Sequence, residues 1–134
     1  MTKAVIFADG ASSGNPGPSG IGAVIKVGAS SHEISEHIGT ATNNVAEYKA
    51  LIEALKKAVE LKADEVVANI DSELLVRQIN GQYRVKNKGL LPLFMEVKEL
   101  LKHFKCYNIY HIPREENREA DVLAKNASLN KETD

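Results

Sequence analysis

The sequence feature that most constrains the fold is a short apolar run near the start of the chain, which ends in an acid. Residues 5–8 (Val-Ile-Phe-Ala) are β-branched, aromatic or small and lack helical spacing, which predicts a strand buried on both faces. Asp9 ends this run, and a buried carboxylate is costly unless a metal ion or a cationic side chain meets it. Glycine and proline in residues 10–20 predict tight turns and a close backbone approach to a ligand. An exposed acid that starts an ordinary hairpin is the alternative for Asp9 alone.

The composition is typical of one globular domain. The chain has 134 residues, of which 26% are charged and 43% hydrophobic, enough to bury a sizeable core. We therefore expect a single domain over residues 1–134, with residues 128–134 as a frayed tail. No stretch is apolar enough to cross a membrane, and the first strand leaves no room for a signal peptide. We expect a cytoplasmic protein without membrane contact.

Charge and cysteine content limit the classes of function. A net charge of −1 gives no global basic field, although a local basic patch can still contact phosphates. The one locally basic run, residues 84–89, falls in a predicted loop. The single cysteine, Cys106, cannot form an internal disulfide, and we expect it to be buried and inert in a strand.

The remaining pattern predicts three antiparallel strands followed by alternating helices and strands. A strand reached through a helical crossover is expected to lie parallel to the first strand. The predicted fold class is therefore α/β, with a five-stranded mixed sheet (three antiparallel strands, then two parallel ones) flanked by helices. After the first strand, the predicted elements are strands at 21–27 and 33–38, a helix at about 43–61, a strand at 65–70, a helix from about 72 to 80, a helix at about 91–104, a strand at 106–112 and a helix around 120–124.

Four acids stand beside predicted strand ends or helix starts: Asp9, Glu47, Asp71 and Asp121. Asp9 and Asp71 each end a strand, and the crossover between these strands would bring both acids to the sheet edge where α/β proteins bind ligands. Glu47 lies near a helix start, where the helix dipole favours an acid. Each acid also has a structural alternative: Asp71 or Ser72 could cap the next helix, and Glu47 could be a solvated surface residue.

Segments 9–17, 42–47, 70–72 and 111–121 resemble, in order, the four motifs of type 1 ribonuclease H. The resemblance covers almost the whole chain and is far more specific than any single acid. It implies the ribonuclease H-like fold and an endonuclease that cleaves the RNA strand of RNA·DNA hybrids. Such enzymes use a divalent metal, usually Mg²⁺ with Mn²⁺ as a substitute, and leave 3′-hydroxyl and 5′-phosphate ends.

The resemblance also implies roles for individual residues. Asp9, Glu47, Asp71 and Asp121 match the four carboxylates of the family's metal site. Two hard cations held by oxygen ligands can activate water on one side of a phosphate and stabilise the leaving oxygen on the other. His111 matches a family histidine that assists proton transfer or product release, which suits the pKa of imidazole. A structural histidine at a strand end is the alternative.

Several polar residues match positions that contact the hybrid. Asparagine can recognise 2′-hydroxyls and base edges, which is how a protein distinguishes RNA from DNA. Thr42 matches a position that could hold a phosphate of the DNA strand. Capping and turn chemistry is the alternative for these residues. The positions that match the groove and backbone contacts are Gly10, Asn15, Asn43 and Asn44.

Two departures from the family pattern concern substrate binding. Glu73 stands where well-known bacterial members carry glutamine, and an ionised Glu can only accept hydrogen bonds. Residues 83–89 replace a longer basic protrusion, so Lys86 and Lys88 would supply only part of its phosphate contacts. We expect a free-standing monomer that binds RNA·DNA hybrid, with double-stranded RNA as a further partner. The alternatives are a non-cleaving binding module of this fold, or a domain of a reverse transcriptase or transposase.

Overall fold

The computed structural model describes residues 2–129 and has the predicted order of strands and helices, with one additional 3-10 helix (η1). The elements are β1 (Lys3–Ser12), β2 (Gly17–Val27), β3 (Ser30–Ala41), α1 (Asn43–Glu60), β4 (Glu65–Ile70), α2 (Glu73–Ile79), α3 (Leu91–Leu101), β5 (Cys106–His111), η1 (Arg114–Glu116) and α4 (Arg118–Leu129).

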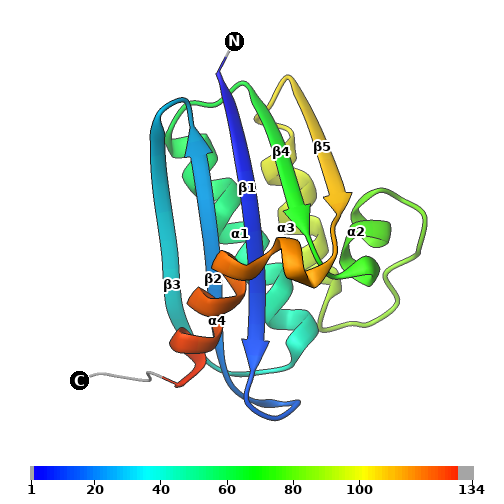
Figure 1. Cartoon of the computed structure of the whole chain (residues 1–134). Helices are drawn as coiled ribbons and strands as arrows, with labels where there is room; N and C mark the ends of the chain where they lie inside the picture. The colour runs from blue at the N-terminus through cyan, green and yellow to red at the C-terminus, as the bar shows by residue number, and fades with distance from the viewer. Residues whose placement is uncertain (1, 130–134) are drawn as a thin grey trace.

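The five strands form one mixed sheet in the order β3-β2-β1-β4-β5. β1 pairs antiparallel with β2 and parallel with β4, and β5 adds parallel to β4. Helices α1 and α3 lie behind the sheet in Figure 1, and α4 crosses its front. The predicted fold class is therefore confirmed.

The central strand β1 is buried on one face only. Ala4, Ile6 and Ala8 are at most 1% exposed, whereas Val5 and Phe7 on the opposite face are half-buried. The prediction of a strand buried on both faces is wrong because α4 packs mainly on β1, β2 and β3 and leaves part of that face open.

The glycine-rich segment extends two strands instead of forming a long loop. β1 continues to Ser12 and β2 begins at Gly17, so Asp9 lies within β1, paired with Gly22, and not at its end. A Cβ atom on Gly20 or Gly22 would come within 2.4 or 2.3 Å of the backbone of α4. These two glycines therefore let α4 approach the sheet, and for Gly20 this packing role replaces the predicted turn role.

Several predicted boundaries also change. α3 ends at Leu101, and α4 runs to Leu129 with Ser128 buried, so the expectation of a frayed tail is wrong for residues 128 and 129. The rest of that tail, 130–134, lies outside the described residues. β3 is longer at both ends than predicted, since its pairing with β2 continues from Ser30 to Ala41.

Cys106 is exposed, so the prediction that it is buried is wrong. It lies on the edge strand β5, on the face opposite the buried Ile109. Across residues 2–129, none of the helices combines the length and the apolar composition needed to cross a membrane.

Candidate active site

Three of the four predicted acids converge near the carboxyl-terminal ends of the neighbouring parallel strands β1 and β4. Asp9 comes from β1, Glu47 from α1, and Asp71 from the residue after β4. One carboxylate oxygen from each of the three lies within 4.8 Å of the others. The parallel pairing explains this geometry, because Ala8 and Ile70 are register partners and the two aspartates directly follow them.

The fourth acid, Asp121, lies beside Asp9 but is not within 4.8 Å of all three members of this group. It is in the first turn of α4, and its Oδ2 is 3.2 Å from Nζ of Lys125. Asp121 lines the same cavity of about 320 Å³ as Asp9 and Glu47. The full lining is Asp9, Gly10, Ala11, Ser12, Asn43, Asn44, Glu47, Arg114, Asp121 and Lys125.

Asp9 is the most constrained of the acids. It is only 6% exposed, and its Oδ1 accepts a hydrogen bond of 2.9 Å from the Gly10 N–H. The pKa of Asp9 is raised from 3.8 to about 8, mainly by burial and also by the nearby carboxylates of Asp71, Asp121 and Glu47. A negative charge at Asp9 is therefore unfavourable without a cation.

The other two acids of the group are also short of positive partners. Burial raises the pKa of Glu47 to about 7; a hydrogen bond from Ser72 and the charge of Arg114 oppose this rise, and Asp71 adds to it. Oδ2 of Asp71 is buried and has no hydrogen-bond partner. Clustered carboxylate oxygens with an unpaired buried atom fit a hard divalent cation such as Mg²⁺ or Mn²⁺.

Ser72, and not Asp71, caps helix α2, because its hydroxyl accepts a hydrogen bond of 3.3 Å from the Leu75 N–H. This finding decides between the two alternatives that the sequence left open. The carboxylate of Asp71 is therefore not used as a cap and faces Asp9 and Glu47.

Gly10 has a packing reason to be glycine in addition to its predicted substrate contact. A Cβ atom at this position would lie 2.3 Å from the carbonyl carbon of Ala46 and 2.4 Å from the Glu47 nitrogen. The absence of a side chain therefore lets the first turn of α1 pack against β1. Through this contact, Gly10 fixes how close Glu47 comes to Asp9.

Three of the predicted substrate-binding residues form local structure. Thr42 is the N-cap of α1 and accepts from the Val45 N–H at 3.2 Å. Asn15 Oδ1 accepts from the Asn43 N–H at 3.0 Å, and Asn43 Oδ1 accepts from the Ser12 N–H at 3.1 Å. These hydrogen bonds are the capping and turn roles that the sequence offered as an alternative, while Asn43 and Asn44 also line the cavity.

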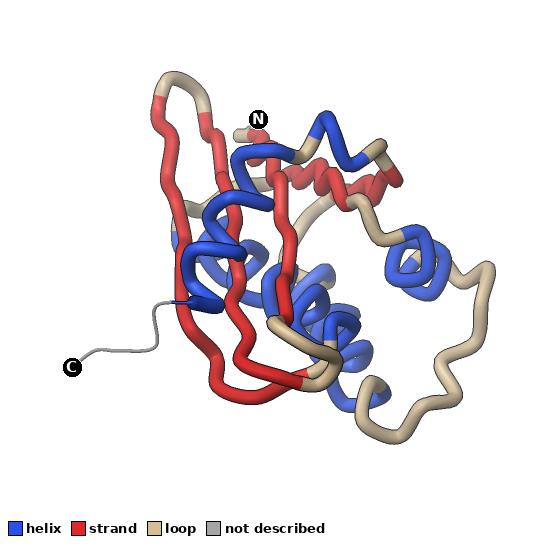
Figure 2. Tube along the Cα trace, turned by 60° about the horizontal axis from the view of Figure 1, so that its bottom comes forward, coloured by secondary structure: helices blue, strands red, loops and turns tan. Residues whose placement is uncertain are grey.

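The remaining predicted residues lie outside the cavity lining. His111 is exposed at the end of β5, and Glu73 forms an exposed ion pair with Arg77 at 2.8 Å. Lys86 and Lys88 are exposed in the connector between α2 and α3, which Figure 2 shows as a long loop standing away from the sheet. The structure does not bring these four side chains together with the acids.

Asn117 contributes to the geometry of the site, although the sequence analysis assigned it no role of its own. It is 1% exposed, and its Nδ2 donates to the carbonyl oxygen of Ala8 at 3.0 Å. Its own carbonyl accepts from the Asp121 N–H at 3.0 Å. Asn117 thereby ties the start of α4 to the β1 backbone next to Asp9. A single Asn in a polar segment carries no sequence signal for such a contact.

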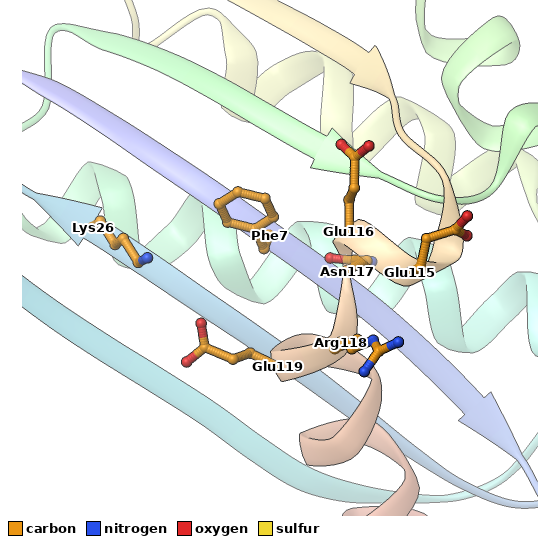
Figure 3. A pocket seen from close by; sticks show the side chains of 7 residues that line it. All are labelled: Phe7, Lys26, Glu115, Glu116, Asn117, Arg118 and Glu119. Carbon is orange, nitrogen blue, oxygen red and sulfur yellow. The ribbon is translucent and has the colours of Figure 1, made fainter.

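A second cavity, of about 180 Å³, lies beside Asn117 and contains none of the four acids. In Figure 3, Phe7 and Lys26 border it from the sheet, and the segment that leads into α4 borders it on the other side. The Lys26 ammonium lies 5.8 Å from the centre of the Phe7 ring. Oδ1 of Asn117 is buried without a partner. The residues that line this cavity are Phe7, Lys26, Glu115, Glu116, Asn117, Arg118 and Glu119.

The fold and the site together define a class of α/β domains. In this class, a carboxylate cluster suited to a divalent metal ion lies near the ends of the central strands of a mixed sheet. The family model described as "Reverse transcriptase-like" matches residues 7–127. Ribonuclease H of Ehrlichia chaffeensis is 34% identical over an alignment of 138 positions. The alignment covers 93% of this chain and 94% of that protein. The chain therefore belongs to the ribonuclease H family.

Further relatives agree with this assignment, although this chain spans only about a third of the length of some of them. The bifunctional protein Rv2228c of Mycobacterium tuberculosis is 45% identical over 128 residues, 93% of this chain. The match spans only 35% of that relative's length. Among solved structures, LC11-RNase H1 in complex with an RNA/DNA hybrid is 42% identical, covers 92% of this chain and 95% of its own, and has a TM-score of 0.85.

Proposed function

We propose that this protein is an endoribonuclease that hydrolyses the RNA strand of RNA·DNA hybrids with the help of two divalent metal ions. The observation that carries the proposal is the convergence of Asp9, Glu47 and Asp71 within 4.8 Å, with Asp121 beside them. The relative named ribonuclease H and the LC11 complex with a hybrid support the reaction and the substrate.

In this proposal, the four acids hold the metal ions. Two cationic side chains of the cavity, Arg114 and Lys125, stabilise the charged forms of these acids. Bound Mg²⁺, or Mn²⁺ in its place, would supply an activated water and stabilise the leaving 3′-oxygen, so that the products carry 3′-hydroxyl and 5′-phosphate ends. Asp9, the most buried of the four acids, would be one of the metal ligands. Arg114 lowers the pKa of Glu47 and so favours its charged form. Lys125 holds Asp121 by an ion pair at the cavity rim.

Substrate recognition is proposed for the polar residues around the cavity. Gly10, Asn43 and Asn44 line it and would face the minor groove, where asparagine can contact a 2′-hydroxyl. Asn15 would act by holding Asn43, and Thr42 would contact a phosphate of the DNA strand.

Three further residues are proposed to act from outside the cavity. Lys86 and Lys88 would contact phosphates from the exposed connector, as part of a short form that lacks the basic protrusion. Exposed His111 would transfer a proton or assist product release. Double-stranded RNA is a second proposed substrate; the monomeric state and the cytoplasmic location stay predictions.

A cleavage assay on RNA·DNA, RNA·RNA and DNA·DNA duplexes of one sequence tests this function. We expect cleavage of the RNA strand of the hybrid with Mg²⁺ or Mn²⁺, no cleavage in chelator, and none by Asp9→Asn. Glu33→Gln, which changes an exposed acid on β3, is the matched control and should cleave like wild type. Hybrid binding without cleavage at any metal concentration would contradict the proposal and favour a binding module.

A further inference from the structure

A buried hydrogen bond joins the two helices next to the acids. The Tyr48 hydroxyl donates to Oε1 of Gln78 at 2.6 Å. Tyr48 is 1% exposed and Gln78 is 5% exposed. Among the side-chain to side-chain hydrogen bonds of residues 2–129, this is the one in which both partners are buried. Tyr48 directly follows Glu47 in α1, and Gln78 lies in α2, which begins two residues after Asp71.

Apart from the core packing of Leu75, Val76 and Ile79, helix α2 has few attachments to the rest of the molecule. It is seven residues long, too short to be stable without tertiary contacts. Two further side-chain bonds hold its C-terminal end: Asn80 Nδ2 donates to the Ile109 carbonyl at 3.1 Å, and Lys98 Nζ donates to the Ile79 carbonyl at 3.3 Å. These bonds lead to β5 and α3, so the bond from Tyr48 is the one that ties this end of α2 to α1.

The Tyr48 bond acts together with a contact at the other end of α2. There, the side chain of Ser72 lies beside that of Glu47. Helix α2 and its cap Ser72 therefore lie against consecutive residues of α1, Glu47 and Tyr48, at both ends of the helix. Without the Tyr48 bond, the direction of α2 relative to α1 would depend on its core packing and on its bonds to β5 and α3. Since Asp71 directly precedes Ser72, a pivot of α2 would change the separation between Asp71 and Glu47.

We propose that Tyr48 and Gln78 are positioning residues of the metal site, whose hydrogen bond sets the spacing between Glu47 and Asp71. This inference rests on the proposed function, because it assumes that these two acids share a metal site. A buried polar pair can often be replaced by apolar residues with little loss of stability. What such a replacement cannot reproduce is the fixed direction and length of an O–H···O bond.

The test uses Tyr48→Phe, Gln78→Met and the double variant in the full chain. The Mg²⁺ concentration that gives half of the maximal thermal stabilisation is measured without substrate, and kcat and KM are measured on an RNA·DNA hybrid. Loss of a partner that orients a metal ligand typically costs about 10- to 100-fold in affinity or activity. Because Tyr48 acts through a whole helix, we expect the Mg²⁺ midpoint to rise by about five- to tenfold, at or below the lower end of that range. The value of kcat at fixed Mg²⁺ should fall, and KM should change less than about twofold, because substrate contacts are intact.

The double variant separates positioning from a purely structural role. Each single variant leaves one buried polar group unpaired, whereas the double variant leaves none, so its melting temperature in chelator should recover toward wild type. We expect its Mg²⁺ midpoint to stay raised. A midpoint that recovers together with the melting temperature would overturn the proposal, because the pair would then serve stability alone.

The control variant is Ile25→Val, which removes one methylene from a fully buried residue of β2. It should lower the melting temperature and leave the Mg²⁺ midpoint unchanged. An equal shift of the midpoint in this control would overturn the proposal. A wild type that responds to Mg²⁺ but does not cleave hybrid would contradict the proposed function alone. A wild type without any Mg²⁺ response would overturn both.

Discussion

Replacing Asp9 by Asn should make the metal-free protein more stable, although it should abolish cleavage. The change removes a charge from a site that is 6% exposed and keeps the shape of the side chain. The Asn oxygen can still accept the hydrogen bond that Gly10 donates to Oδ1 at 2.9 Å. The main effect is therefore electrostatic, because the variant carries no buried negative charge at this position.

The magnitude follows from the pKa of Asp9. An increase from 3.8 to about 8 corresponds to at most about 5 to 6 kcal/mol, at about 1.4 kcal/mol for each pKa unit. The neighbouring acids share protons with Asp9, and the site can relax, so we expect about 1 to 3 kcal/mol. For a domain of this size, such a gain raises the melting temperature by about 4 °C per kcal/mol.

The sign of the pH dependence is fixed by the direction of the pKa change. Asp9 binds its proton more tightly in the folded state, so its protonation stabilises the fold below about pH 4. That stabilisation is lost as the pH rises toward about 8, the pKa of Asp9 in the folded protein. In chelator, wild type and Asp9→Asn should therefore have similar free energies of unfolding near pH 4, and the variant should be the more stable near pH 8.

The assay is urea denaturation in chelator at pH 4, 6 and 8, with Glu33→Gln as the exposed-acid control. Added Mg²⁺ should stabilise wild type by about 2.7 kcal/mol at 100 times its dissociation constant, and the variant by less. If Asp9→Asn is no more stable than the control variant at pH 8, burial and the neighbouring carboxylates do not raise the pKa of Asp9 as the structure indicates. If both proteins gain equally from Mg²⁺, Asp9 is not a ligand.

Three further predictions concern other residues. Asp71→Asn should melt in chelator at or above the wild-type temperature, because Ser72 caps α2 and Asp71 Oδ2 has no partner, yet it should not cleave hybrid. A clearly lower melting temperature together with a wild-type response to Mg²⁺ would make Asp71 structural. Lys86→Ala with Lys88→Ala should weaken hybrid binding and reduce its salt dependence, whereas an unchanged salt slope in a binding titration would make this loop a simple connector. His111→Ala should lower kcat much more than hybrid affinity in steady-state kinetics, and a loss confined to binding or to the melting temperature would assign His111 to the fold.

Local sequence patterns were enough to determine the order and type of the elements. Residues 65–70 were predicted as a strand and form β4. Residues 42–44 were predicted to supply the cap of the next helix, which begins at Asn43 with Thr42 as its cap. Both depend on signals within a few residues: alternation of side chains in the strand, and a capping hydroxyl before an apolar helical face. The sequence also indicated that Asp9 and Asp71 would meet, because a helical crossover between strands makes them parallel.

Tertiary structure decided what depends on contacts between distant residues. Asp9 lies within β1 because pairing with β2 extends the strand, and Cys106 is exposed because β5 is an edge strand. The contacts of Asn117 with Ala8 and of Tyr48 with Gln78 join residues on different elements. No local pattern encodes such pairs, since each forms only when packing brings the two elements together. The spacing of the acids depends on these contacts, so the sequence identified the acids and only the packed fold determined their distances.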